Sequence, residues 1–312
     1  MIEPQIPCPR CGSFTSVEKV FCVRCGSRVI PLTEYDLTAS DFIYPPDESA
    51  LESFREFKPL SPLINELILK RYVRALFSRL EGGLAEISLS SEVGSIIREC
   101  GIILGLRSLP RSYLLKSDKP LAFTFGTGKS DYLFLSSGLL DLLDDRELRA
   151  AIGHELGHVK CGHSIYHTIA GVLTSGIELS LGLMGGALSS ISSPMLRLML
   201  LSWHRDSEIS ADRAGLIVAN DLGKVISLLR KLHREPPESG ELLGEILSTH
   251  PTYEDRVKRV SEYYRSADYH AVKRKVERRL RLSKALSPVC RFCGGSKPLT
   301  SIFCPSCGRS QL

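Results

Sequence analysis

Residues 147–161 read ELRAAIGHELGHVKC, and the five residues from His154 to His158 decide what kind of fold must surround them. On a helix, His154 and His158 lie one turn apart on the same face, so both imidazoles can reach one metal ion. Glu155 lies beside that face, where its carboxylate can take a proton from a water that the metal activates. The stretch therefore predicts a zinc site with Glu155 as the general base.

The alternative interpretation of residues 154–158 is an exposed polar face of a helix. The flanking residues argue against it, because they are apolar and indicate a buried helix: Ala150, Ala151, Ile152, Leu156 and Val159. Polar groups on a buried face need a partner, since burying them without one is costly. A metal ion is such a partner.

A third protein ligand is expected from a second helix downstream, because a catalytic zinc site combines three protein ligands with one open position. Glu208 and Asp212 lie one turn apart in RDSEISADR, residues 205–213. An ordinary acidic surface helix is the alternative, but like charges at this spacing repel slightly. We expect Glu208 to bind the metal and Asp212 to accept a hydrogen bond from a histidine ligand, fixing its tautomer.

Two more histidines, His163 and His167, follow the motif. On the same straight helix they would lie too far along the axis to share the ion with His154 and His158. We therefore expect both to be structural.

The two ends of the chain repeat one cysteine pattern. Eight of the ten cysteines form Cys-x-x-Cys pairs with the same gap between pairs at each end, and Cys100 and Cys161 stand alone. Two thiolates spaced in this way point at one tetrahedral ion, so the pairs favour structural zinc over disulfides. The predicted ligands are Cys8, Cys11, Cys22 and Cys25 at one end and Cys290, Cys293, Cys304 and Cys307 at the other.

A glycine follows the second cysteine of every pair: Gly12, Gly26, Gly294 and Gly308. Glycine accepts the positive φ that a tight turn around the thiolates requires. Segments this short bury too little apolar surface to fold alone, so a bound ion would supply the folding energy. The sequence thus predicts three zinc ions per chain, one catalytic and two structural.

Length and composition fit one sizeable core with small attachments: 312 residues, 43% hydrophobic, with a net charge of +5. Most of the positive charge comes from residues 273–281, a run that is typical of a solvated helix face. The first residues, MIEPQIPCPRCG, contain no basic stretch followed by an apolar run and so predict no secretory signal. Zinc-binding thiolates suit a reducing compartment. We expect a cytoplasmic protein, with peripheral membrane association at most.

The predicted elements run from helices through a small antiparallel sheet to more helices, which argues for a mostly helical α+β fold. Helices are expected at 62–82, 92–104 and 137–143, and Asp144 with Glu147 forms a capping box that opens the helix of the motif. Short strands are expected at 113–115, 121–125 and 132–135.

Four motifs lie between about residue 60 and residue 259: LSSGLL at 135–140, HELGH at 154–158, Arg205-x-x-Glu208-x-x-Ala211-Asp212, and His250-Pro251 followed by Arg256. In these motifs the chain resembles the HtpX-like and CAAX-prenyl-protease zinc metallopeptidases, which belong to the gluzincin group. The resemblance implies a mostly helical gluzincin domain that hydrolyses protein or peptide substrates. It assigns zinc binding to His154, His158 and Glu208, catalysis to Glu155 and ligand support to Asp212.

Two further roles rest on the resemblance alone. The family binds its substrate as a strand added to a sheet edge, and the matching segment is 122–125, with Ala122, Phe123 and Thr124 as the contact residues. Strand addition suits extended or unfolded substrate segments, because it satisfies backbone groups without reading most side chains. His250 is implied as a stabiliser of the oxyanion, and a helix-capping histidine before Pro251 is the equal alternative.

The chain departs from the family between the two ligand helices, where HtpX-like members place membrane-spanning helices. Residues 164–201 are the candidate here, but Glu178 interrupts them and glycines, serines and Pro194 dilute them. A spanning helix needs about 20 mainly apolar residues. We favour two core helices packed by small residues, so membrane contact is not favoured.

The predicted division of the chain is a zinc ribbon at 1–30, a surface linker at 31–58, a zinc metallopeptidase domain at 59–270, a basic helical linker at 271–288 and a second zinc ribbon at 289–312. Zinc ribbons bind nucleic acid in some proteins and protein in others. We assign the ribbon aromatics to the small cores of the modules, which argues against nucleic-acid binding and favours protein docking: Phe14, Phe21, Phe292 and Phe303.

The competing hypothesis is a protein that binds protein or nucleic acid through its ribbons and uses an inactive peptidase scaffold. The intact Glu155 argues against it.

Overall fold

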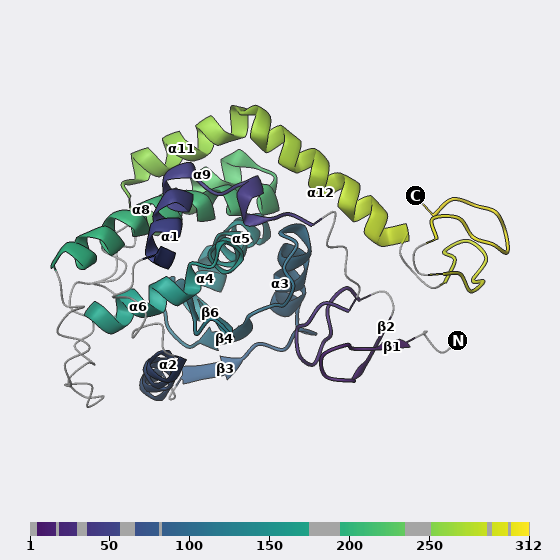
Figure 1. Cartoon of the computed structure of the whole chain (residues 1–312), viewed down its shortest axis with the longest axis horizontal. Coiled ribbons are helices and arrows are strands. Elements are labelled where there is room, and N and C mark those ends of the chain that lie inside the picture. Colours follow the sequence, from purple (N-terminus) through teal and green to yellow (C-terminus); the bar gives the residue numbers. More distant parts are fainter. Residues whose placement is uncertain are drawn as a thin grey trace.

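The computed structural model describes residues 5–16, 19–29, 36–56, 66–80, 83–174, 194–234, 251–285, 289–298 and 301–311. Its helices are η1 (Ala39–Asp41), α1 (Pro45–Glu56), α2 (Glu66–Leu80), α3 (Glu92–Ile103), α4 (Ser137–Leu142), α5 (Asp145–Cys161), α6 (Ser164–Thr174), α8 (Pro194–Ala219), α9 (Leu222–Arg234), α11 (Tyr253–Arg265) and α12 (Ala267–Ala285). Its strands are β1 (Gln5–Pro7), β2 (Phe14–Ser16), β3 (Leu84–Glu86), β4 (Arg111–Leu115), β5 (Ala122–Gly126) and β6 (Asp131–Ser136). Helices surround one small sheet, with α5 in the middle (Figure 1).

The central sheet has four strands in the order β3-β4-β6-β5. The β3–β4 and β5–β6 pairs are antiparallel, whereas β4 and β6 run parallel. The predicted antiparallel sheet is therefore mixed. The parallel pair arises because β5 turns out to the edge and the chain returns as β6 between β4 and β5. Strand β3 was not predicted, since its three residues are too few to show a pattern.

Helix α5 begins where the capping box predicts. It ends before His163 and His167, which were expected to lie on the same helix. Asp144 accepts hydrogen bonds from the backbone N–H groups of Arg146 and Glu147, and the Glu147 carboxylate accepts one from the Asp144 N–H, which completes the capping box. The helix stops at Cys161, because Gly162 adopts φ 79° and turns the chain. The residues after it therefore do not continue along the axis of α5.

The segment predicted as a surface linker contains helix α1, and that prediction needs correcting. Leu51 and Phe54 of α1 are buried in the main core, where the Phe54 ring contacts Tyr166 and Trp203. The apolar face of α1 is short, and the acidic residues and prolines around it gave the segment the composition of a linker. The predicted basic linker at 271–288 likewise lies mostly in α12, whose Val272 is buried in the same core.

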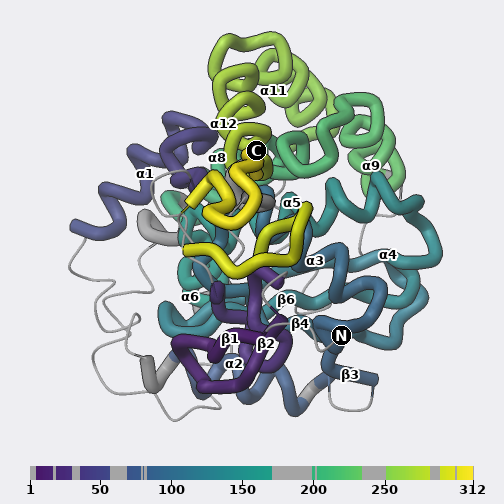
Figure 2. Tube along the Cα trace, turned by 90° about the vertical axis from the view of Figure 1, so that its right-hand side faces the viewer, coloured from purple at the N-terminus to yellow at the C-terminus, as the bar shows by residue number. Residues whose placement is uncertain are grey.

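Both cysteine modules lie at the same end of the molecule. In Figure 1 the N-terminal module lies beside α3 and the C-terminal module lies beyond the end of α12; Figure 2, which faces that end, shows the C-terminal module above the N-terminal one.

The candidate membrane segment at 164–201 is described only at its ends, by α6 and the start of α8. Among the helices of the described ranges, none combines the length and the hydropathy that crossing a membrane requires.

Candidate active site and zinc sites

The structure brings the three predicted catalytic ligands together. Nε2 of His154 lies 3.2 Å from Nε2 of His158, and Glu208 places one carboxylate oxygen 3.5 Å from His154 Nε2 and the other 3.3 Å from His158 Nε2. Ligand atoms about 2.05 Å from a tetrahedral zinc ion lie about 3.3 Å from one another. Both the donor set and its spacing therefore fit a zinc ion.

Small residues let the two ligand helices approach closely enough for this geometry. On α5, a Cβ added to Gly157 would lie 2.6 Å from Cβ of Ala214 on α8, and one added to Gly153 would lie 2.8 Å from Cβ of Val218. Larger side chains at these two positions would push α8 away and move Glu208 out of reach. The glycines of the motif thus serve the site as much as its histidines do.

Asp212 lies behind the first histidine, as the sequence predicts. Its Oδ1 lies 3.0 Å from Nδ1 of His154. Arg256, on α11, binds the same carboxylate at two points, with Nη2 2.6 Å from Oδ1 and Nε 2.8 Å from Oδ2. Burial would raise the pKa of Asp212, but the charge of Arg256 outweighs it and lowers that pKa. The motif predicts Arg256 without its contact, which the structure shows to be the Asp212 carboxylate.

The charged groups around His154 and Arg256 shift the pKa of both residues. Burial alone would lower the pKa of His154, but the carboxylates of Glu208 and Asp212 raise it to about 10. Glu155 is 6% exposed, and its negative charge contributes, after that of Asp212 and Glu208, to raising the pKa of Arg256 against the effect of burial. Glu155 therefore lies close enough to Arg256 for its charge to act on the same cluster as the ligands.

His163 and His167 were predicted to continue the helix of the motif, but they follow a turn and do not lie on α5. After the turn at Gly162, His163 folds back so that its Nδ1 lies 3.0 Å from Nδ1 of His158. The His167 ring packs against His158 with centroids 4.5 Å apart, and burial lowers the pKa of both His158 and His167. Among the described residues, the group that could hold this ion is His154, His158 and Glu208.

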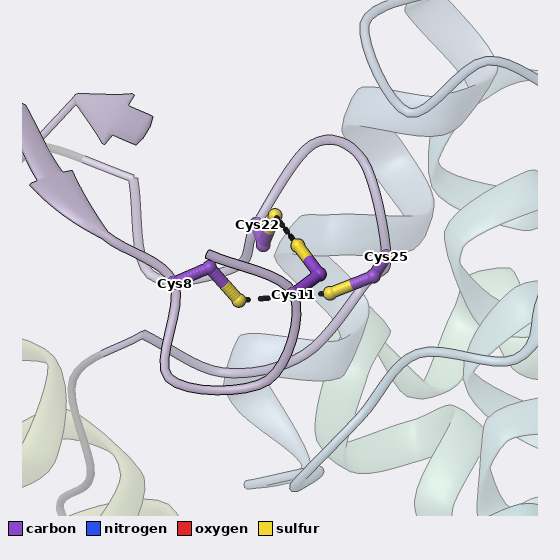
Figure 3. Close-up of side chains that lie close together, drawn as sticks. All are labelled: Cys8, Cys11, Cys22 and Cys25. Atoms are coloured by element: carbon purple, nitrogen blue, oxygen red, sulfur yellow. Dashed lines mark hydrogen bonds between the residues drawn. The ribbon is translucent and has the colours of Figure 1, made fainter. Parts of the chain in front are cut away.

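Each set of four cysteines gathers around one point. In the N-terminal module the Sγ atoms of Cys8 and Cys25 are 3.6 Å apart and those of Cys11 and Cys22 are 3.7 Å apart (Figure 3). In the C-terminal module the pairs Cys290–Cys307 and Cys293–Cys304 are each 3.7 Å apart. All ten cysteines are free thiols, and sulfurs bound to one tetrahedral zinc ion lie about 3.8 Å apart. The geometry fits zinc.

The backbone at these cysteines matches the sequence prediction. The four glycines that follow the second cysteines all have φ between 67° and 71°: Gly12, Gly26, Gly294 and Gly308. The prediction that the ribbon aromatics form the small cores of the modules is wrong. Phe14, Phe292 and Phe303 are exposed, and Phe21 is buried in the main core instead.

The remaining predicted residues fall in two places. Ala122, Phe123 and Thr124 lie on β5, which is an edge strand of the sheet. His250 lies outside the described residues. The lone Cys100 and Cys161 are buried, and burial raises the pKa of both thiols.

A helix with two histidines one turn apart, a glutamate between them and a second helix that supplies a further glutamate define a metallopeptidase. The model of Peptidase family M48 matches residues 88–264. The chain therefore belongs to peptidase family M48, a family of metallopeptidases.

Two relatives and one solved structure are similar to the chain. The chain is 31% identical over 219 residues to the plastoglobule-localized metallopeptidase 48, chloroplastic, of Arabidopsis thaliana; the match covers 69% of this chain and 62% of that protein, less than two thirds of its length. It is 26% identical over 213 residues to a protease HtpX homolog of Paraburkholderia phytofirmans, covering 56% of this chain and 74% of the relative. The crystal structure of S. mikatae Ste24p aligns with a TM-score of 0.40 at 17% identity, over 69% of this chain and 61% of that one.

Proposed function

We propose that this chain is a zinc-dependent metalloendopeptidase that hydrolyses peptide bonds in protein or peptide substrates. The observation that carries the proposal is the convergence of His154, His158 and Glu208 at separations of 3.2–3.5 Å, in a chain of family M48. His250 remains a candidate for the oxyanion role.

The side chains around the site have separate tasks. A zinc ion held there would supply Lewis acidity, polarising the peptide carbonyl and lowering the pKa of an attacking water. Glu155 would take the proton of that water and pass it to the leaving amine. Asp212, fixed by Arg256, holds Nδ1 of His154, so that the lone pair on Nε2 would be available to bind the metal.

A substrate strand would pair with β5 over a short stretch. The Ser136 N–H donates to the Leu121 carbonyl, so alternate residues of β5 face β6 and the backbone groups of Ala122, Thr124 and Gly126 face outward. Thr168 already donates to and accepts from the backbone of Gly126, and His167 binds the backbone of Thr124. We propose that a substrate strand pairs with the outward-facing backbone at Ala122 and Thr124, with Phe123 between them. Helix α6 restricts this edge at Thr124, through His167, and ends it at Gly126, through Thr168.

The two cysteine modules are proposed as zinc ribbons with one structural ion each, giving three ions per chain with the catalytic one. Protein docking through the ribbons stays the favoured role, although the exposed Phe14, Phe292 and Phe303 remove one argument against nucleic acid. Because eight zinc-binding thiols need reduction, we also propose a cytoplasmic location, which cell fractionation would test.

The test compares casein or peptide cleavage by the wild type and by Glu155→Gln, which keeps the size of the side chain and removes its basicity. We expect activity to fall by about 100-fold or more, while three zinc ions per chain are retained. Asp145→Asn, at the exposed start of the same helix, is the matched control and should cleave normally. Full hydrolysis by Glu155→Gln would remove the mechanism, and two zinc ions in the zinc-replete wild type would favour the inactive scaffold.

A further inference from the structure

A buried carboxylate from the N-terminal segment lies behind the second histidine of the motif. Asp47, on α1, is fully buried, and its Oδ2 lies 3.0 Å from Nε2 of His163. Nδ1 of His163 lies 3.0 Å from Nδ1 of His158, whose Nε2 in turn lies 3.3 Å from Glu208. A chain of contacts thus connects α1 to the catalytic centre.

Asp47 is held in place independently of the histidines. Its Oδ1 accepts a hydrogen bond from Nε1 of Trp203 at 2.8 Å, and its Oδ2 accepts one from the Ser210 hydroxyl, both on α8. The same helix carries Glu208. The carboxylate behind His163 and the glutamate in front of His158 are therefore fixed to one rigid element.

The chemistry of these partners favours one placement of the protons on the two rings. Asp47 acts as an acceptor, so the nitrogen of His163 that faces it carries the hydrogen. Nε2 of His163 is buried and lies 3.0 Å from Oδ2 of Asp47, within ion-pair distance, although within the described residues its geometry does not meet that of a hydrogen bond. Nδ1 of His163 then carries the lone pair and accepts the Nδ1–H of His158, which leaves the lone pair of His158 on Nε2.

We propose that Asp47 and His163 are positioning residues for His158, holding its ring in the tautomer and orientation that present Nε2 to the metal. The inference rests on the proposed zinc site. Each histidine ligand then has its own buried carboxylate: Asp212 acts on His154 directly, and Asp47 acts on His158 through His163. Loss of an outer partner of this kind costs about 10–100-fold in metal affinity or activity.

The simpler explanation is that Asp47 only joins α1 to α8. The test therefore measures zinc binding and stability separately, using the full chain. Native mass spectrometry at buffered free zinc counts the ions on each chain, and the ion whose loading is lost in His154→Ala is the catalytic one. The variants are Asp47→Asn, His163→Gln and the double variant. Asp36→Asn is the matched control, since Asp36 is a buried acid of the same segment that pairs with Arg28 and Arg279 instead.

We expect Asp47→Asn and His163→Gln each to raise the free zinc needed for half-loading of the catalytic site by about 10–100-fold. The double variant should add little to the larger single effect, because Asp47 acts through His163. Asp36→Asn should lower the melting temperature and leave catalytic-site loading unchanged. Rate measurements should agree, with the loss in the Asp47 and His163 variants restored by excess zinc.

Unchanged zinc loading in Asp47→Asn, with only a stability loss like that of Asp36→Asn, would overturn the inference and leave the proposed function intact. Additive effects in the double variant would overturn it as well. If Asp47→Asn does not fold, His163→Gln decides by the same measurement. A wild type that loads no ion dependent on His154 would instead overturn the proposed function, and the positioning role with it.

Discussion

The two cysteine modules have the same spacing but different surroundings. Phe21, directly before Cys22, is 1% exposed and belongs to the main core, whereas Phe303, directly before Cys304, is 55% exposed. Both phenylalanines form the same local bridge to the residue two positions after the module's last glycine, Phe21 with Arg28 and Phe303 with Ser310. The two modules therefore have the same local backbone structure, but only the N-terminal module packs its phenylalanine into the main core.

Hydrogen bonds and ion pairs strengthen the contrast. The Leu109 N–H donates to the Gly26 carbonyl at 3.0 Å, so the N-terminal module is bonded to the loop before β4. Arg28 pairs with Asp36, which also binds Arg279 of α12 at 3.1 Å. The C-terminal module follows α12 and presents Phe292 and Cys293 on its surface. The comparison suggests that the first module is part of the peptidase body and that the second is an appendage.

The largest difference is expected when one proposed zinc ligand is removed from each module. Cys22→Ser should unfold the N-terminal module, because the proposed ion would supply its folding energy, and should destabilise the peptidase body by more than about 4 kcal/mol. Cys304→Ser should leave the main unfolding transition of the body unchanged. Differential scanning calorimetry of the full chain would measure both. Equal shifts in the two variants would show that the modules are embedded alike.

A smaller difference is expected from the matched aromatic pair. Phe21→Ala removes a buried ring from the main core and should cost about 3–5 kcal/mol, a drop in Tm of roughly 10 °C for a domain of this size. Phe303→Ala removes an exposed ring and should change stability by less than about 0.5 kcal/mol. Thermal unfolding followed by circular dichroism tests the pair. A stable Phe21→Ala variant would mean that the N-terminal module does not share the core.

The features that the sequence predicts correctly are those set by local spacing. The capping box depends on the separation of three residues between Asp144 and Glu147. The positive φ after each Cys-x-x-Cys pair depends on one glycine. The contact of His154 and His158 with Glu208 joins two helices and is not set by local spacing. It could still be predicted, because a catalytic zinc site needs a third protein ligand and the acidic pair Glu208 and Asp212 offers one.

The features that the sequence does not predict depend on which distant surfaces meet. Phe21 and Phe303 have the same local context, so spacing cannot tell which one is buried. Asp47 lies in a segment whose composition is that of a linker, and its link to His163 exists only because α1 packs on α8. The parallel pairing of β4 with β6 likewise follows from a chain crossing and not from strand composition.

The smallest difference is expected at the glycines that end the two modules. Gly26 and Gly308 have nearly the same backbone, with φ 67° and 68°, so alanine should cost about 1–2 kcal/mol of local strain at either position. The two sites differ only in their neighbours: a Cβ on Gly26 would lie 3.3 Å from both the Cβ and the carbonyl oxygen of Leu109, and one on Gly308 would meet nothing within 4 Å.

Gly26→Ala should therefore carry its strain, together with the displacement of Leu109, into the unfolding of the peptidase body, whereas Gly308→Ala should weaken only zinc retention by the C-terminal module. Calorimetry reports the first effect, and zinc release to a chelator reports the second. Because the backbone strain is common to both variants, a difference in the main transition isolates the contact with the body. If Gly308→Ala lowered the main transition as much as Gly26→Ala does, the C-terminal module would also have to be counted as part of the folded peptidase.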